Sequence, residues 1–224
     1  MSETPSEQQP DSVFYRPQRP RRSESSLSRD RIVAASVALL DRDGASALTM
    51  RKVAAELGVH ATSLYWYVQR REDLIDLAVD HVLAEAASAL PGDDVPWDDV
   101  VFRVAKQYYD SFVAHTWAAE FAGARPLIGP NALALAQRII TALREAGGTE
   151  QDRAIAASAI SQQVLGAATT AAVVGGLSNA PADELAAAVG TPETLGIWIP
   201  PFDDVLRLLV DAIRARLAAA NPDR

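Results

Sequence analysis

The chain of 224 residues contains no cysteine, two methionines and three histidines, and aromatic residues make up 6% of it. The absence of cysteine excludes disulfides, cysteine-based zinc sites and thiol nucleophiles. No run of about 18 uncharged apolar residues occurs, and the N-terminus lacks an apolar segment of signal-peptide length. These absences favour a soluble, cytoplasmic protein that has no membrane partner.

The sequence also lacks the common signatures of an active site. The three histidines show no metal-ligand spacing, and there is no glycine-rich phosphate loop or nucleophile elbow. Four aspartates between positions 93 and 99 could pair as acids, but Pro91, Gly92 and Pro96 place the first two on a linker. We therefore expect no enzyme, no cofactor and no metal site.

What the sequence has in abundance is alanine, with leucine and valine next, and 49% of its residues are hydrophobic. This composition predicts packed helices, because alanine and leucine are good helix formers and β-branched residues do not lead. Strand-like alternation of useful length is absent, so we expect an all-α fold.

Charge is distributed unevenly along the chain, whose net charge is −8. The segment from Arg16 to Arg71 holds eleven lysines and arginines against five acidic residues, whereas the chain after it is strongly acidic. A basic segment on an acidic body is typical of a two-part DNA-binding protein. Chance unevenness is the alternative.

Residues 1–26 are rich in proline, serine, glutamine and arginine and have little to bury, which predicts a flexible arm. Within it, the stretch "RPQRPRR" ends in Arg19, Arg21 and Arg22. Proline keeps such an arm extended, and arginine can enter a narrow minor groove of DNA. A solvated tail is an equally good interpretation.

Residues 28–67 have the pattern of a helix followed by a helix-turn-helix. Ser28 is a suitable N-cap for a helix to about residue 42, which Gly44 ends. Thr49 can cap a short helix over residues 51–57, and Gly58 can take the positive φ of a tight turn. A second short helix then opens at residue 61 or 62 and runs through residue 67.

The aromatic cluster in "LYWYV" lies on that second short helix. Leu64 and Val68 share one side at helical spacing and are expected to face the core. Tyr65 and Trp66 then point outward or sideways, where they could contact thymine methyl groups and phosphates. The alternative is packing beneath the preceding helix, which suits Tyr67 better than Trp66.

The remaining chain reads as longer helices separated by breaks. We expect a helix from about residue 71 to 90, a surface linker over 91–97 and a helix from residue 97 onward. After a second break at 123–131, Asn131 is expected to cap a helix over 132–145. Further helices are expected over 151–174 and 202–219, on either side of a looser region.

The stretch "ALTMRKVAAELGVHATSLYWYVQRREDLIDLA" strongly resembles the DNA-binding domain of the tetracycline-repressor (TetR) family. "LYWYV" is especially close to the founding tetracycline-repressor branch, and "GARP" and "GPNALALAQRIITALREAGG" resemble its ligand-binding domain more weakly. The match extends from about residue 28 to 174.

The resemblance implies an all-α homodimer that binds a palindromic DNA operator and is released by a small-molecule effector. It implies a helix-turn-helix DNA-binding domain over residues 27–73 and a ligand-binding and dimerisation domain over 74–224. In the family, two C-terminal helices of each chain pair as a four-helix bundle. The corresponding helices here are those at 151–174 and 202–219.

By position, the resemblance assigns DNA contacts to residues on both short helices and just beyond. These are Thr49, Arg51, Ala61, Thr62, Ser63, Tyr65, Trp66, Tyr67 and Arg71. Arg51 is the choice for a base contact, because its guanidinium fork suits O6 and N7 of guanine. Ala61 stands where tetracycline repressors carry a longer polar residue, which predicts a different operator.

The effector site departs from that branch. Tetracycline repressors bind the drug's magnesium ion with a histidine just before the "GARP"-like stretch, and here Phe121 corresponds to it. Phenylalanine cannot ligate a metal, so we expect no magnesium–tetracycline site. We expect an apolar pocket with a few polar anchors, which suits a bulky, mostly hydrophobic effector such as an antibiotic or a biosynthetic product.

The candidate pocket residues are aromatic or polar side chains of the C-terminal part, and an ordinary core or interface role is the favoured alternative for each. They are Tyr108, Phe112, His115, Trp117, Phe121, Gln162, Gln163, Thr169 and Trp198. An alternative function is a DNA-binding regulator without a small ligand, controlled by a protein partner or by its own abundance. A pocket occupied by a copurifying molecule would separate the two.

Overall fold

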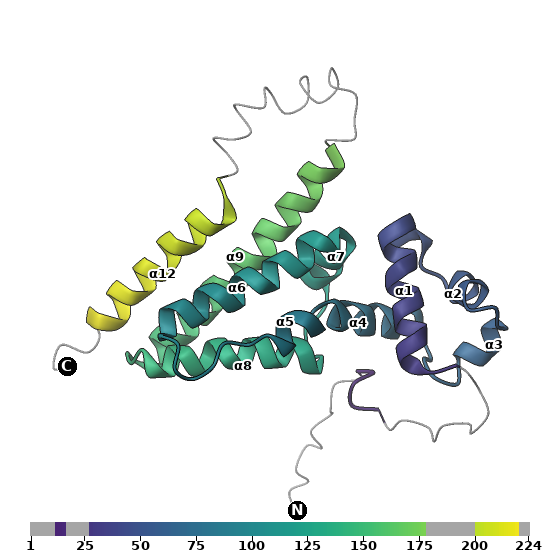
Figure 1. Cartoon of the computed structure of the whole chain (residues 1–224), viewed down its shortest axis with the longest axis horizontal. Coiled ribbons are helices and arrows are strands. Elements are labelled where there is room, and N and C mark those ends of the chain that lie inside the picture. Colours follow the sequence, from purple (N-terminus) through teal and green to yellow (C-terminus); the bar gives the residue numbers. More distant parts are fainter. Residues whose placement is uncertain (1–11, 17–26, 178–199, 220–224) are drawn as a thin grey trace, which may run out of the picture.

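The computed structural model describes residues 12–16, 27–177 and 200–219, and within these ranges the regular structure is helical without a strand. This confirms the predicted all-α fold. The first helices gather at one end of the molecule, and the longer helices form a body at the other (Figure 1).

The first part of the chain folds through its caps. Helix α1 spans Arg29–Asp43; the Ser28 side chain accepts a hydrogen bond from the Arg31 amide at 3.2 Å, and Gly44 ends the helix with φ 76°. A single 3-10 turn, η1 (Ala45–Ala47), leads to α2 (Met50–Glu56), where Thr49 accepts from the Lys52 amide at 3.2 Å. Helix α3 (Ala61–Leu64) follows. Both predicted N-caps are confirmed.

The remaining helices continue into the body of the molecule. They are α4 (Arg71–Val82), α5 (Ala84–Ser88), α6 (Trp97–Ala114), α7 (Thr116–Ala124), α8 (Pro130–Glu145), α9 (Glu150–Leu177) and α12 (Phe202–Ala219). Helix α6 packs against α8 and α9, and α12 packs against α9 and α6. Helix α4 contacts α1 on one side and α7 and α8 on the other, so it joins the small end to the body (Figure 1).

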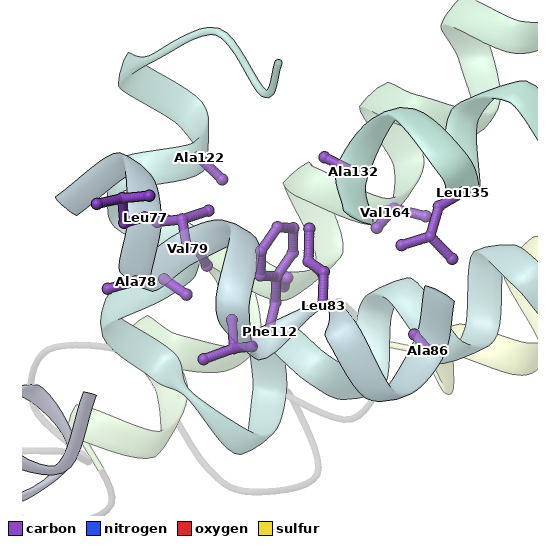
Figure 2. Close-up of a cluster of buried hydrophobic side chains, with 14 of the residues drawn as sticks. Leu77, Ala78, Val79, Leu83, Ala86, Phe112, Ala122, Ala132, Leu135 and Val164 are labelled. Carbon is purple, nitrogen blue, oxygen red and sulfur yellow. The ribbon is translucent and has the colours of Figure 1, made fainter. Parts of the chain in front are cut away.

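The core of the body forms where these helices meet. Phe112 of α6 is fully buried and lies among aliphatic side chains that include Leu83, Val79 and Val164 (Figure 2). Small residues such as Ala122 and Ala132 line the same cluster (Figure 2). Alanines let the helix backbones approach closely around one large ring, which suits the alanine-rich composition.

Four predicted helix boundaries were wrong. Helix α3 ends at Leu64, and residues 65–67 form a turn. The helix expected from 71 to 90 is divided at the buried Leu83. The long helix from Trp97 is interrupted at His115, which leaves helical geometry (φ −126°, ψ 74°).

The fourth error is the cap of α8. Gly129 is the N-cap and Asn131 lies inside the first turn, because Asp80 of α4 caps this helix from outside. Its carboxylate accepts from the amides of Asn131 and Ala132, both at 3.0 Å. A Cβ atom at Gly129 would overlap the Asp80 carboxylate, so only glycine fits beside this cap.

The prediction that residues 1–26 form a flexible arm is wrong for residues 12–16. Ser12 and Val13 are buried, and the Tyr15 amide closes a turn on the Ser12 carbonyl at 3.1 Å. The low hydrophobicity of the surrounding sequence hides this short apolar segment, "SVFY". Arg19, Arg21 and Arg22 of the predicted arm lie outside the described residues.

Candidate nucleic-acid interface

Helices α2 and α3 are held in a fixed relation by the turn between them. Gly58 takes φ 64°, as predicted, and the Val59 amide returns to the Ala54 carbonyl at 3.0 Å. Positive φ at this position strains any side chain with a Cβ, which explains the glycine. The result is a helix-turn-helix in which α3 projects beside α2.

The aromatic cluster divides between core and surface. Leu64 and Val68 are buried, and Tyr67 is half-buried and packs against the core. Tyr65 and Trp66 are 49% and 45% exposed. The two rings therefore stand on the outer side of the unit, while the residues on either side anchor it. Large rings on a surface commonly mark a contact site.

Other predicted DNA-contacting residues share this outer surface. Arg51 on α2 and Thr62 and Ser63 on α3 are exposed, and Ala61 is half-buried at the start of α3. Thr49 is exposed, but its hydroxyl oxygen is also the cap of α2. Lys52, which was not among the predicted contacts, is also exposed next to Arg51, and its charge and position are visible in the sequence.

Arg71, also predicted to contact DNA, forms hydrogen bonds to the backbone of the loop before α2. Its Nε donates to the Leu48 carbonyl at 2.8 Å and its Nη2 to the Ala45 carbonyl at 3.1 Å. The side chain is half-buried and ties the start of α4 to the loop before α2. Arg71 thus fixes the helix-turn-helix against α4.

Helix α4 carries three aspartates on one face, at spacings of three and four residues, and each binds a different segment. Asp73 binds Arg16 and Arg70, Asp76 binds Arg125, and Asp80 caps α8. Burial opposes ionisation of Asp73, but the hydrogen bonds from Arg16 and Arg70 outweigh it and lower its pKa. Burial raises the pKa of Asp80, against the hydrogen bonds from Ala132 and Asn131.

A fourth aspartate, near the C-terminal end of α1, joins this helix to α6 and α7 of the body. Asp41 accepts hydrogen bonds from His115 Nδ1 at 2.7 Å and from Trp117 Nε1 at 2.6 Å. His115 occupies the junction of α6 and α7, so this junction is attached to the end of the molecule that carries the helix-turn-helix. Sequence reasoning missed Asp41, because nothing in the sequence pairs residues so far apart.

The aromatic candidates for the effector site on α6 and α7 are buried or half-buried. Phe112 and Trp117 are buried, and Tyr108 is half-buried with its ring 5.1 Å from that of Phe112. Burial raises the pKa of Tyr108. Phe121 is half-buried, with its ring 6.4 Å from that of Trp117.

The candidates on α9 are polar and differ in exposure. Gln162 and Thr169 are exposed, and Gln162 donates to Ser158 on the same helix at 3.0 Å. Gln163 is half-buried, and Trp198 lies outside the described residues. The aromatic candidates of α6 and α7 thus form two ring pairs, Tyr108 with Phe112 and Trp117 with Phe121, whereas Gln162 and Thr169 are exposed on α9.

Among the described residues, no group of three or more histidine, aspartate or glutamate side chains could hold a metal ion. None of the helices in these same ranges is long and apolar enough to cross a membrane.

A helix-turn-helix unit with an exposed outer face, joined by one helix to a larger helical body, defines a two-part DNA-binding regulator. Residues 32–78 match the family model "Bacterial regulatory proteins, tetR family", and residues 90–193 match "Tetracyclin repressor-like, C-terminal domain". An HTH-type transcriptional regulator of Saccharopolyspora erythraea is 38% identical over 94% of both chains. The chain therefore belongs to the TetR family of transcriptional regulators, which are DNA-binding proteins rather than enzymes.

Two further comparisons concern structural relatives, one in complex with a small molecule and one in complex with DNA. The chain is similar to Streptomyces coelicolor ActR in complex with actinorhodin, with a TM-score of 0.69 and 28% identity over 89% of this chain and 100% of that one. It is also similar to BioQ bound to its double-stranded DNA operator, with a TM-score of 0.62 and 26% identity over 84% and 99% of the two chains.

Proposed function

We propose that this regulator is a homodimeric repressor that binds a palindromic operator through α2 and α3 and is released by a small, mostly hydrophobic effector. The observation that carries the proposal is the exposed pair Tyr65 and Trp66, set on an anchored helix-turn-helix beside Arg51. A large aromatic surface next to basic side chains suits the edges and backbone of a major groove.

The proposed DNA contacts use the exposed residues of this surface. Arg51 reads a guanine, Thr62 and Ser63 reach phosphates or base edges, and Tyr65 and Trp66 contact thymine methyl groups and phosphates. Ala61 lets α3 approach the groove closely. Thr49 and Arg71 contribute mainly by holding α2 and α4 in place, given their hydrogen bonds.

Dimerisation through α9 and α12 is supported by their outer faces. Leu208 of α12 is 71% exposed, and Ile155 and Val173 of α9 are also exposed. Helices α9 and α12 pack side by side, and we place these exposed side chains on one apolar side of the molecule. A second copy would cover that surface and form a four-helix bundle.

The effector site is proposed to lie in the C-terminal part, around the aromatic group that includes Tyr108, Trp117 and Phe121. Actinorhodin in the ActR complex is an example of an effector bound by a structural relative. Phe121 argues against a magnesium-bound drug. An effector with higher affinity for the DNA-free conformation would release the operator by shifting the population of the two states.

Footprinting and release together test this proposal. Hydroxyl-radical footprinting on the DNA that flanks the gene is expected to show two protected patches about one helical turn apart. Aromatic polycyclic compounds, and any molecule that copurifies with the chain, are then added to the complex. The contrary result is a footprint that persists with every compound and with every copurifying molecule, while side chains fill the pocket of the chain. That result would favour a regulator controlled by a protein partner or by its own abundance.

A further inference from the structure

The short segment Ser12–Arg16, called the strap below, packs onto both parts of the molecule although it precedes the DNA-binding domain. Val13 is 2% exposed and belongs to the hydrophobic core. Its carbonyl accepts a hydrogen bond from Arg29 Nη2 of α1 at 3.2 Å. The strap is therefore attached to α1 by a buried side chain and by its backbone.

The strap also binds the beginning of α4. Arg16 donates from Nη1 to Asp73 Oδ2 at 2.7 Å and from Nη2 to Asp73 Oδ1 at 3.0 Å. Asp73 is 1% exposed at its side chain, and it also accepts from the Arg70 amide at 3.2 Å, which caps α4. A two-pronged guanidinium–carboxylate pair fixes direction as well as distance.

The middle of the strap lies at the junction between α4 and the body. Phe14 lines this junction with Asp80 of α4, with Phe121 of α7 and with the loop from Arg125 to Gly129. The space left there is about 10 Å³, which is no larger than one water molecule requires. On its other side Phe14 lines an open groove of about 440 Å³ between α1, α4 and the start of α8. Phe14 thus lies where α4, the end of α7 and the start of α8 meet, and it fills the side of this junction that faces α7.

These contacts complete a set of three attachments along α4. Asp76 and Asp80 attach the helix to the body through Arg125 and the start of α8, and Asp73 attaches it to the strap. The strap supplies the attachment nearest to the helix-turn-helix. Without it, the beginning of α4 retains its own cap and its contacts with α1 and with the loop before α2.

We propose that the strap sets the orientation of α4, and with it the DNA-binding unit, relative to the body, and that Arg16 is a positioning residue for operator binding that acts through Asp73. The inference rests on the proposed operator-binding function. It differs from the interpretation of the N-terminal arginines as minor-groove contacts, because Arg16 is committed to a buried carboxylate.

The orientation is measured first without DNA. The native chain has no cysteine, so Ala55→Cys on α2 and Ala136→Cys on α8, both exposed, introduce two spin labels at chosen positions. The doubly labelled chain is mixed with an excess of unlabelled native chain, so that each oligomer contains at most one labelled chain. Pulsed electron paramagnetic resonance then reports the distance between the two labels within one chain. Arg16→Ala is expected to shift or broaden this distance distribution, and Arg16→Lys is expected to restore part of it.

Operator affinity is measured next, as a function of salt. Arg16→Ala is expected to weaken operator binding about tenfold with an unchanged dependence on salt, because the lost contact is intramolecular. Arg103→Ala removes an exposed arginine from α6 and is the matched control for net charge. It is expected to leave both the distance and the affinity unchanged.

Three results would overturn the proposal. A salt slope smaller by about 0.9, with equal loss on random DNA, would make Arg16 a phosphate contact. A lower melting temperature with unchanged distance and affinity would make the strap a stabilising segment only. An unchanged distance between the spin labels in both Arg16→Ala and Phe14→Ala would show that the strap does not orient α4. This outcome is independent of DNA binding, so it applies even if the native chain binds no operator.

Discussion

At the residue scale, Trp66 and Arg51 are the side chains with the largest expected contribution to DNA binding. We expect Trp66→Ala and Arg51→Ala each to weaken operator binding by about 1–3 kcal/mol, because a ring contact or a two-pronged base contact is lost. Both residues are exposed, so the melting temperature should change little. Anisotropy titration with a melting curve checks both points.

Arg103→Ala serves as the control for these two variants, since it removes one positive charge from the surface of α6. Operator affinity equal to native in a folded Trp66→Ala, Arg51→Ala double variant would contradict the assignment of this surface to DNA.

Asp73 gives the molecule an expected dependence of stability on pH. Its pKa is lowered in the folded state, so its stabilisation is present above the ordinary value of 3.8 and is lost as pH falls through the lowered pKa. Asp73→Asn should therefore lower the free energy of unfolding by about 1–3 kcal/mol at pH 7. The difference from native should shrink below pH 4.

Urea unfolding of both proteins at several pH values measures this difference. The difference in unfolding free energy between the native protein and Asp73→Asn could stay constant from pH 7 to pH 3. That result would show that the hydrogen bonds from Arg16 and Arg70 do not stabilise the charged form of Asp73.

At the scale of elements, the connection between α4 and α8 depends on one carboxylate. Asp80→Ala leaves the buried Ala132 amide without its acceptor and removes the cap of α8, which is expected to cost about 1–3 kcal/mol. Asp110→Ala is the control, since Asp110 forms an ion pair with Lys106 at the surface of α6. That pair is worth about 0–1 kcal/mol.

Chemical denaturation measures the cost for both variants. Equal losses of stability in Asp80→Ala and Asp110→Ala would mean that Asp80 does not hold α8 to α4.

Local signals in the sequence predicted elements well wherever the determinants lie within a few residues. Ser28, Thr49 and Gly58 mark caps and a turn that depend only on neighbouring backbone atoms. The outward position of Trp66 followed from the apolar spacing of Leu64 and Val68. The proposed DNA-binding surface can therefore be predicted largely from the sequence.

Features set by distant residues could not be predicted in this way. Asn131 looks like an N-cap, but the cap comes from Asp80, which is 51 residues earlier in the chain. The interruption at His115 coincides with its bond to Asp41 of α1, and the strap depends on Asp73. Each involves a partner that only the folded chain brings close.

At the scale of the whole molecule, the apolar side formed by α9 and α12 is expected to hold two chains together. The native protein should have about twice the chain mass of 24.0 kDa in light scattering. Leu208→Glu places a charge on that side and is expected to shift the protein toward the monomer. Leu133→Glu, on the exposed surface of α8, is the control and should leave the mass unchanged.

A monomeric native protein at micromolar concentration, or a Leu208→Glu variant as dimeric as the control, would contradict dimerisation through α9 and α12. It would also remove the reason to expect a palindromic operator.

The most direct test of the central claim is a fluorescence-anisotropy titration of the native chain against the DNA that flanks its own gene, at several salt concentrations, with random DNA alongside. We predict a saturable complex that is at least about a thousandfold tighter than the complex with random DNA at physiological salt. Binding that equals random DNA at every salt concentration, by protein freed of any copurifying molecule, would contradict the account of a repressor that acts at this site.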